Sequence, residues 1–181
     1  VVLTYRLRRP GQLASGQADL LIGPPGEIVI DLNREPLYSE EQVTLLARDH
    51  PALAGGRRLT LKSFLAAGHV MVSTEGRGTG PIDAMLASRG LKRRIAVVLP
   101  AFAAVPLIVG ATDLIATLPS RLVASLAPAA RIGVARPPIM IEGFTVHLMW
   151  HGRRDGDPLH AWLRGVIRDV ASTLEPVPRL R

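Results

Sequence analysis

The chain has 181 residues, of which 48% are hydrophobic and 20% charged, a balance that fits one folded domain or two small lobes and excludes a disordered or fibrous chain. It has no cysteine, which excludes disulfides and thiolate metal ligands. Its 22 basic residues, only two of them lysines, give a net charge of +7. The arginines occur at most in pairs, so no basic DNA-binding surface is indicated. Aromatic residues make up only 4%, which argues against a surface that stacks the bases of single-stranded nucleic acid.

The apolar stretches are short. The longest, residues 95–110, is broken by Pro100 and Pro106 and falls below the ~20 residues that a bilayer span requires. The segment Val1 to Arg9 lacks the order of basic region, apolar core and cleavage site that marks a secretory signal. We therefore expect no membrane span and a location in the cytoplasm.

Strand-like apolar segments alternate with segments of helical period, which is typical of an α/β fold with a largely parallel sheet. We expect strands at residues 1–7, 18–23, 28–37, 41–48, 69–73, 95–99, 114–117, 132–135 and 145–150. We expect helices at residues 11–16, 59–67, 80–90, 102–109, 119–126 and 157–174. In the strand at 41–48, Val43, Leu45 and Ala47 are expected on one face.

Three helices carry clear end signals. Thr60 can cap the helix at 59–67, and Gly90 closes the helix that Gly80-Pro81 opens. The last helix begins at Asp157, with Pro158 in its first turn. We expect Trp162 to pack in the core. The apolar positions that recur at helical spacing as one stripe are Leu159, Trp162, Leu163, Val166, Ile167, Val170 and Leu174.

The segment from Ser73 to Gly80 is the best candidate for a ligand site. It lies between a predicted strand and a helix start, where free backbone N–H groups and the helix dipole favour an anion. It lacks the spacing of a P-loop and of the dinucleotide fingerprint. On spacing alone, a ligand-binding loop and a flexible turn both remain open.

Other polar residues give no support for catalysis. His147 and His151 are four residues apart, but their neighbours alternate as in a strand, so we expect no metal site. Ser73 and Ser120 lack the nucleophile elbow of hydrolases, and Asp113 precedes a predicted strand, where a turn role is expected. We therefore predict no enzymatic activity and no cofactor.

Five motifs, in this order, resemble the effector-binding domain of LysR-type transcriptional regulators. They are ADLLIG at 18–23, RDHPAL at 48–53, LTL at 59–61, TDLIATLP at 112–119, and an ending built from Trp150-His151, Asp157-Pro158 and Trp162-Leu163-Arg164. The resemblance runs through nearly the whole chain. It is closest to the branch that contains the salicylate- and nitroaromatic-responsive regulators and the nodulation regulators.

The resemblance implies a fold similar to the type 2 periplasmic binding proteins, with two α/β lobes joined by two crossover strands. By analogy, lobe one is residues 1–70 with 143–181, and lobe two is residues 71–142. The family's first strand and first helix of lobe one have no counterpart here. Its N-terminal helix-turn-helix domain is also absent, so the chain alone is not expected to bind an operator.

The same resemblance implies a small effector in the cleft between the lobes. The residues that correspond to its site are Pro24, Ser73, Thr74, Gly76, Arg77, Gly78, Thr79, Phe102 and Thr112. Phe102 offers an apolar wall and Arg77 a charged partner for a carboxylate. In salicylate-responsive relatives, histidines stand where this chain has Ala101 and Thr79. We expect a small, partly apolar, aromatic acid.

The mechanism implied is a population shift, in which the effector changes the geometry of a homodimer or tetramer and so the spacing of its DNA-binding domains. Two other functions share the fold. A periplasmic solute-binding protein would need a signal peptide and would usually act as a monomer. A transferase would need a catalytic pair in the cleft, and the loop from Ser73 to Gly80 shows no general base.

Overall fold

The computed structural model describes residues 3–4, 10–25, 31–56, 58–73, 76, 78–126 and 131–174. These residues form two compact units. Unit 1 contains the described residues up to Glu40 and those from Gly143 onward, and unit 2 contains those from Glu41 to Glu142. Among the described residues, no helix combines the length and the apolar composition that a bilayer span requires.

The division between the units differs from the predicted one at its first boundary. The sequence places that boundary after Val70, whereas the structure places it between Glu40 and Glu41. The reason is strand pairing, because residues 42–47 form hydrogen bonds with strands at 115–119 and 132–135, which belong to the same sheet as Val70. The second boundary, between Glu142 and Gly143, is the same in both.

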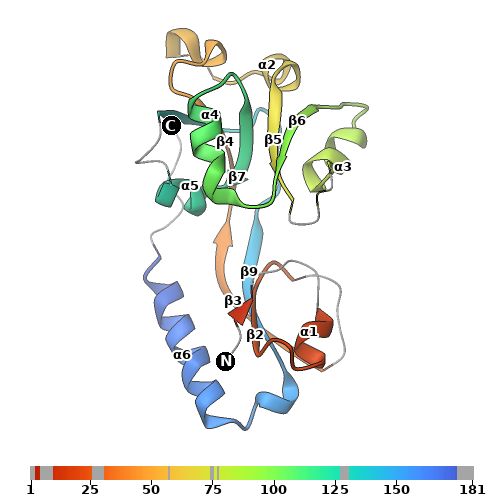
Figure 1. Ribbon diagram of the computed structural model, residues 1–181, viewed down its shortest axis with the longest axis vertical. Coiled ribbons are helices and arrows are strands. Elements are labelled where there is room, and N and C mark those ends of the chain that lie inside the picture. Colours follow the sequence, from red (N-terminus) through yellow and green to blue (C-terminus); the bar gives the residue numbers. More distant parts are fainter. Residues whose placement is uncertain are drawn as a thin grey trace. The chain divides into compact units, whose positions relative to one another are not determined.

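Unit 1 is built on a four-stranded sheet (Figure 1). Its elements are β1 (Leu3–Thr4), α1 (Pro10–Ala14), β2 (Leu20–Gly23), β3 (Leu32–Glu40), β9 (Phe144–His151), η4 (Gly152–Arg154) and α6 (Pro158–Ser172). The strand order is β1-β2-β9-β3, with β1 parallel to β2 and with β9 antiparallel to both β2 and β3. A small core forms from Leu13, Ala18, Leu21 and Met149.

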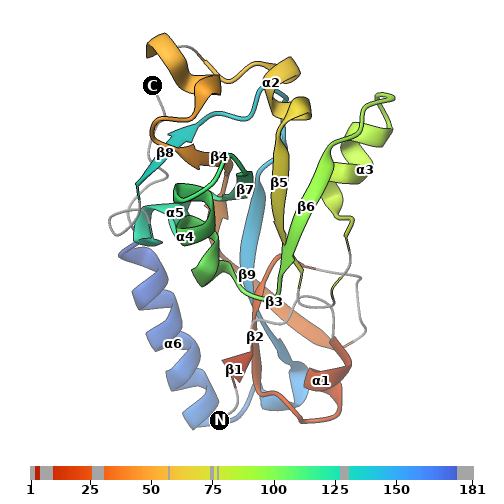
Figure 2. The ribbon, with the colours of Figure 1, turned by 45° about the horizontal axis from the view of Figure 1, so that its top comes forward.

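Unit 2 contains a five-stranded sheet with helices on both faces (Figures 1 and 2). Its elements are β4 (Gln42–Ala47), η1 (Pro51–Gly56), α2 (Leu61–Ala66), β5 (Gly68–Val72), α3 (Pro81–Ala87), β6 (Arg94–Leu99), η2 (Phe102–Ala104), α4 (Val105–Gly110), β7 (Ile115–Pro119), α5 (Ser120–Leu126) and β8 (Ile132–Ala135). The strand order is β6-β5-β7-β4-β8. Strand β5 is parallel to β6 and β7, whereas β4 is antiparallel to β7 and β8.

The α/β class is therefore confirmed, but both sheets are mixed rather than largely parallel. The predicted strands and α-helices occur in the observed order within the described residues. The 3-10 helices η1 and η4 were not predicted, Phe102 to Ala104 forms a 3-10 turn before α4, and residues 5–9 lie outside the described part. The predicted caps are also confirmed. Thr60 accepts a hydrogen bond from the Ser63 N–H, and Gly90 adopts a left-handed backbone after α3.

The core of unit 2 has two parts, one on each face of the sheet. Alternate residues of β4 show this directly, since Val43 and Leu45 pack with α4 and α5 residues while Leu46 packs with Phe64 of α2 and α3 residues. Val43 and Leu45 share one face, as predicted, and all residues from Val43 to Ala47 are buried, so both faces of this strand are covered. A strand that lies between two other strands and is covered by helices on both faces has a continuous run of apolar residues in its sequence.

The apolar stripe of α6 is not core. Its exposed side chains include Leu159 (62%), Trp162 (64%) and Val170 (59%), whereas the buried positions of the helix are His160 and Ala171. The prediction that Trp162 packs in the core is therefore wrong. The helix contacts the described part of unit 1 through its other face, where Arg168 pairs with Glu35 of β3.

The C-terminal motif residues join β9 to α6 within unit 1. The Trp150 indole N–H donates to Asp155 Oδ1 at 2.7 Å, and the Arg164 guanidinium lies 4.7 Å from the Trp150 ring centroid. The Asp157 carboxylate accepts from the Leu159 N–H and the His160 N–H, which caps α6. The motif residues Trp150, Asp157 and Arg164 therefore have a structural role, which is to hold β9 and the start of α6 together.

Candidate ligand-binding edge of unit 2

The parallel strands of unit 2 bring three chain segments to one edge of the sheet. Because β5, β6 and β7 run in the same direction, the residues that follow them, beginning at Ser73, Pro100 and Ser120, lie at a shared carboxyl edge. In open α/β sheets, ligands bind in the crevice outside the carboxyl ends of the strands. This carboxyl edge is therefore the candidate site in unit 2.

Ser73 is fixed where β5 ends. Its N–H donates to the Leu99 carbonyl at 2.8 Å, which ties the end of β5 to the end of β6, and its own carbonyl accepts from the Gly76 N–H at 3.2 Å. Gly76 has a φ of 70°, a left-handed conformation that a side chain would strain. The turn after β5 therefore starts from a defined geometry.

The far end of this turn is held at Gly80. The Gly80 N–H donates to Asp83 Oδ2 at 2.8 Å, and a Cβ at Gly80 would lie 2.9 Å from Met71 Cε. Asp83 is in turn paired with Arg93, whose Nε lies 2.7 Å from Asp83 Oδ1. The hydrogen bond from Gly80 to Asp83 and the ion pair of Asp83 with Arg93 together set where the segment joins α3.

Phe102 begins the turn that follows β6. Its ring is partly buried against the core cluster that contains Val70 and Val105, so only part of it is available to a ligand. Phe102 and Ser73 follow neighbouring strands. Ser73 and Phe102 therefore lie at one edge of the sheet of unit 2.

Thr112 lies at the other edge. It precedes β7, and its hydroxyl donates to the Ile108 carbonyl at 2.7 Å and accepts from the Leu114 N–H at 3.2 Å. Because β7 is parallel to β5, a residue before β7 is at the amino edge, opposite Ser73. The prediction that Thr112 joins Ser73 and Phe102 is wrong, since its side chain ends α4 instead.

The remaining predicted residues are placed as follows. Gly78 and Thr79 lie in the segment between Gly76 and Gly80, whereas Thr74 and Arg77 lie outside the described residues. Pro24 belongs to unit 1, where it follows β2 directly. Its neighbour Gly23 is opposite His147 of β9 in the strand register.

Two further polar residues, expected above to have no catalytic or metal-binding role, lie next to strand ends, namely Ser120 in unit 2 and His147 in unit 1. Ser120 follows β7, is buried, and donates its N–H to the Glu41 carbonyl at 2.9 Å. His147 is half-buried beside the end of β2, with Nδ1 3.1 Å from the Thr145 carbonyl. The sequence could have indicated Ser120, because it is a polar residue directly after a buried strand. The position of His147 could not be predicted in this way, because it depends on pairing between β9 and β2, which are far apart in the sequence.

Metal binding finds no support in the geometry. Within residues 3–4, 10–25, 31–56, 58–73, 76, 78–126 and 131–174, no three histidine or acidic side chains gather as metal ligands. His147 and His151 both lie on β9, as the alternation of their neighbours predicted, and His151 Nδ1 accepts from the Arg153 N–H. The edge of unit 2 therefore offers backbone groups, hydroxyls and an aromatic wall.

Comparison with known proteins gives consistent matches. The LysR substrate binding domain family matches residues 3–172. The HTH-type transcriptional regulator SyrM of Rhizobium meliloti is 33% identical over 90% of this chain and 50% of its own length, and nodulation protein D of Rhizobium leguminosarum bv. trifolii is 31% identical over 91% and 51%. The crystal structure of the regulatory domain of MexT, a transcriptional activator in Pseudomonas aeruginosa, superimposes with a TM-score of 0.76 and 29% identity, over 88% of this chain and 76% of that one. The chain spans about half the length of the curated relatives it matches.

Proposed function

The chain belongs to the LysR substrate-binding domain family, and we propose that it is the effector-sensing domain of a LysR-type transcriptional regulator. The observation that carries the proposal is the family match over residues 3–172, supported by relatives that are themselves transcription regulators. We assign it no catalytic role. In this proposal, the whole regulator binds operator DNA in the cytoplasm through an N-terminal helix-turn-helix domain.

The proposed effector site includes the carboxyl edge of unit 2. The geometry that supports it is the position of Ser73, the Gly76–Gly80 segment and Phe102 beyond the ends of neighbouring parallel strands. Thr74 and Arg77 belong to the same segment in the sequence. Pro24 of unit 1 completes the proposal through the family resemblance.

The proposed effector is a small, partly apolar, aromatic acid. Phe102 provides a partly exposed ring against which an aromatic group can pack. Arg77 provides a guanidinium that can form a charge-assisted pair with a carboxylate. The two chemistries together favour a molecule with a flat apolar body and one acidic group.

The proposed mechanism is a shift between two arrangements of an oligomer. An effector that binds one arrangement better than the other changes their populations by its difference in affinity. In a homodimer or tetramer, that shift changes the spacing of the attached DNA-binding domains. An effector with equal affinity for both arrangements would have no regulatory effect.

A thermal-shift screen tests this proposal. We expect a benzoic-acid derivative at about 100 times its dissociation constant to stabilise the chain by about 2.7 kcal/mol, which corresponds to roughly 5 to 10 °C in melting temperature. Size-exclusion chromatography with light scattering, with and without the acid, reports the oligomeric state. No response to any aromatic acid from a folded oligomer would contradict the effector class.

Matched variants locate the site. Ser73→Ala and Phe102→Ala are expected to reduce the thermal shift because both lie at the carboxyl edge. Thr112→Ala, at the opposite edge of the same sheet, is expected to leave the shift unchanged. A shift that survives in the first two variants and is lost in the third would contradict the proposed location.

A further inference from the structure

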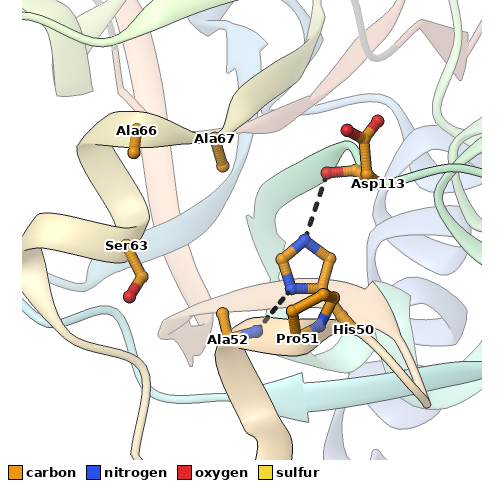
Figure 3. A pocket seen from close by; sticks show the side chains of 7 residues that line it. All are labelled: His50, Pro51, Ala52, Ser63, Ala66, Ala67 and Asp113. Carbon is orange, nitrogen blue, oxygen red and sulfur yellow. Dashed lines mark hydrogen bonds between the residues drawn. The ribbon is translucent and has the colours of Figure 1, made fainter.

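The amino edge of the unit 2 sheet carries a hollow of about 390 Å³ that the proposed effector site does not use (Figure 3). It is bordered by the start of η1, by α2 and by the loop before β7. These segments precede β5 and β7, so the hollow lies at the edge opposite Ser73 and Phe102. The hollow is shallow and open to solvent, since Pro51, Ala66 and Asp113 of its lining are exposed.

Small apolar side chains form most of the wall. The residues that line the hollow are His50, Pro51, Ala52, Ser63, Ala66, Ala67 and Asp113. Three of the seven are alanines, whose side chains are short (Figure 3). A ligand here would contact methyl groups and a proline ring, which favours a compact apolar body.

The imidazole of His50 forms one side of the hollow and is hydrogen-bonded to two chain segments that border it. Its Nδ1 accepts a hydrogen bond from the Ala52 N–H at 3.0 Å, which requires a lone pair on that nitrogen. Its Nε2 therefore carries the proton and donates to the Asp113 carbonyl at 3.1 Å (Figure 3). Both ring nitrogens are occupied, so His50 fixes the shape of the hollow and offers no free polar group to a ligand.

The carboxylate of Asp113 is the group in the lining that can select a ligand. Ser63 already bonds with Thr60, their hydroxyl oxygens 2.8 Å apart. Asp113 is exposed, and no side chain or N–H in the part of the chain that the structure describes donates to its carboxylate. An apolar hollow with one unpaired carboxylate at its rim complements a small molecule with an ammonium group.

We propose that this hollow is a second small-molecule site, which binds a compact apolar amine in its protonated form. The apolar body would lie against Ala52, Ala66 and Ala67, and the ammonium group would pair with Asp113. The site is independent of the proposed effector edge, because its residues lie at the other end of the sheet.

Titration with cyclohexylamine at pH 7 tests the site. In ¹H–¹⁵N correlation spectra of the 181-residue chain, we expect saturable shifts at residues 50–52, 63–67 and 112–114 and none around Ser73. Cyclohexanol and cyclohexanecarboxylate have the same ring without the cation, and we expect each to bind about two- to fivefold more weakly, since an ion pair at an exposed carboxylate contributes about 0.2–1 kcal/mol.

Two variants and a control make the test specific. Asp113→Asn is expected to weaken cyclohexylamine binding about two- to fivefold, and Ala66→Leu is expected to abolish it by filling the hollow. Asp49→Asn removes an exposed charge next to His50 that does not line the hollow, so it should change the affinity less than about twofold. Unchanged binding in Asp113→Asn, equal affinity for cyclohexanol, or no saturable shift at these residues would overturn the proposal, whatever the outcome of the effector screen.

Discussion

The carboxylate of Asp83 ties the guanidinium of Arg93 to the amino end of α3. Its two oxygens accept from Arg93 Nε at 2.7 Å and Arg93 Nη2 at 3.0 Å, and Oδ2 also accepts from the Gly80 N–H at 2.8 Å. The side chain of Arg93 is only 4% exposed. This pair therefore compensates a buried charge and at the same time fixes one end of the candidate effector loop.

Replacing Asp83 by asparagine should strongly destabilise unit 2. We expect Asp83→Asn to lower the free energy of unfolding by about 3 kcal/mol, because the buried Arg93 charge loses its partner. Urea unfolding followed by circular dichroism measures the change. Asp113→Asn removes an exposed carboxylate instead and is expected to change stability by less than about 0.5 kcal/mol. Equal losses in the two variants would contradict the role of the ion pair.

The stabilisation from Asp83 should depend on pH. Burial alone would raise the pKa of Asp83, but the hydrogen bond and the charge of Arg93 outweigh it, so the pKa lies below its ordinary value of 3.8. The folded state thus favours the ionised carboxylate, and its contribution is present above the unfolded pKa and lost as the pH falls through the folded one. We expect the stability gap between the wild type and Asp83→Asn to be constant above about pH 5 and to narrow below pH 4. A gap independent of pH would contradict this assignment.

His69 should make stability fall with decreasing pH as well, but over a higher pH range than Asp83. It is fully buried on β5, with Nε2 2.8 Å from the Phe64 carbonyl and no described partner at Nδ1. Desolvation by burial lowers the pKa of His69 from its ordinary 6.5 to about 4. Between pH 6.5 and 4 the unfolded chain takes up a proton that the folded chain excludes, so stability should fall by about 3 kcal/mol over this range.

Removing the imidazole should remove that slope. We expect His69→Leu to be less stable than the wild type at pH 7, because the Phe64 carbonyl loses its donor, but to show a flatter stability profile between pH 6.5 and 4. Leu86→Ala lies in the same core cluster as Phe64 and retains the imidazole. It should lower stability at every pH while keeping the slope. The assignment is wrong if His69→Leu retains the wild-type slope.

Local signals allowed most element boundaries to be predicted, because a cap or a left-handed glycine acts within one turn of chain. Thr60 and Gly90 are examples. Strand partners depend on contacts distant in sequence, and no local pattern shows that β4 pairs with β7 and β8. This is why the expected parallel sheet proved mixed and why the lobe boundary after Val70 differs from the structure.

The residues of the candidate site also differ in whether a local sequence pattern could predict them. Ser73 and the glycine segment were found because a strand followed by a turn and a helix is a local pattern. Thr112 was misplaced because its edge of the sheet depends on the direction of β7 relative to β5. The family resemblance supplied the site residues but not this direction.

The exposed stripe of α6 leads to a direct test with Trp162. Its side chain is 64% exposed, so we expect Trp162→Gln to change the free energy of unfolding by less than about 1 kcal/mol. Phe64→Ala, which truncates a fully buried ring, should cost about 3–5 kcal/mol. Urea unfolding of both variants decides between an exposed and a packed position. A loss in Trp162→Gln as large as that in Phe64→Ala would show that this face of α6 is covered.

Two glycines should respond to alanine with opposite signs. At Gly68 of β5, a Cβ would lie 2.7 Å from Leu114 Cδ2 and 2.8 Å from Arg94 Nη2, so Gly68→Ala should destabilise the chain by about 1–3 kcal/mol. At Gly165, inside α6, no described atom lies within 4 Å of the added Cβ. Gly165→Ala should therefore stabilise the chain by about 0.5–1 kcal/mol, since alanine favours a helix interior. Melting temperatures of the two variants should move in opposite directions from the wild type. If the melting temperatures of both variants fell, other atoms would have to lie close to Gly165. The exposed position of this part of α6 would then be wrong.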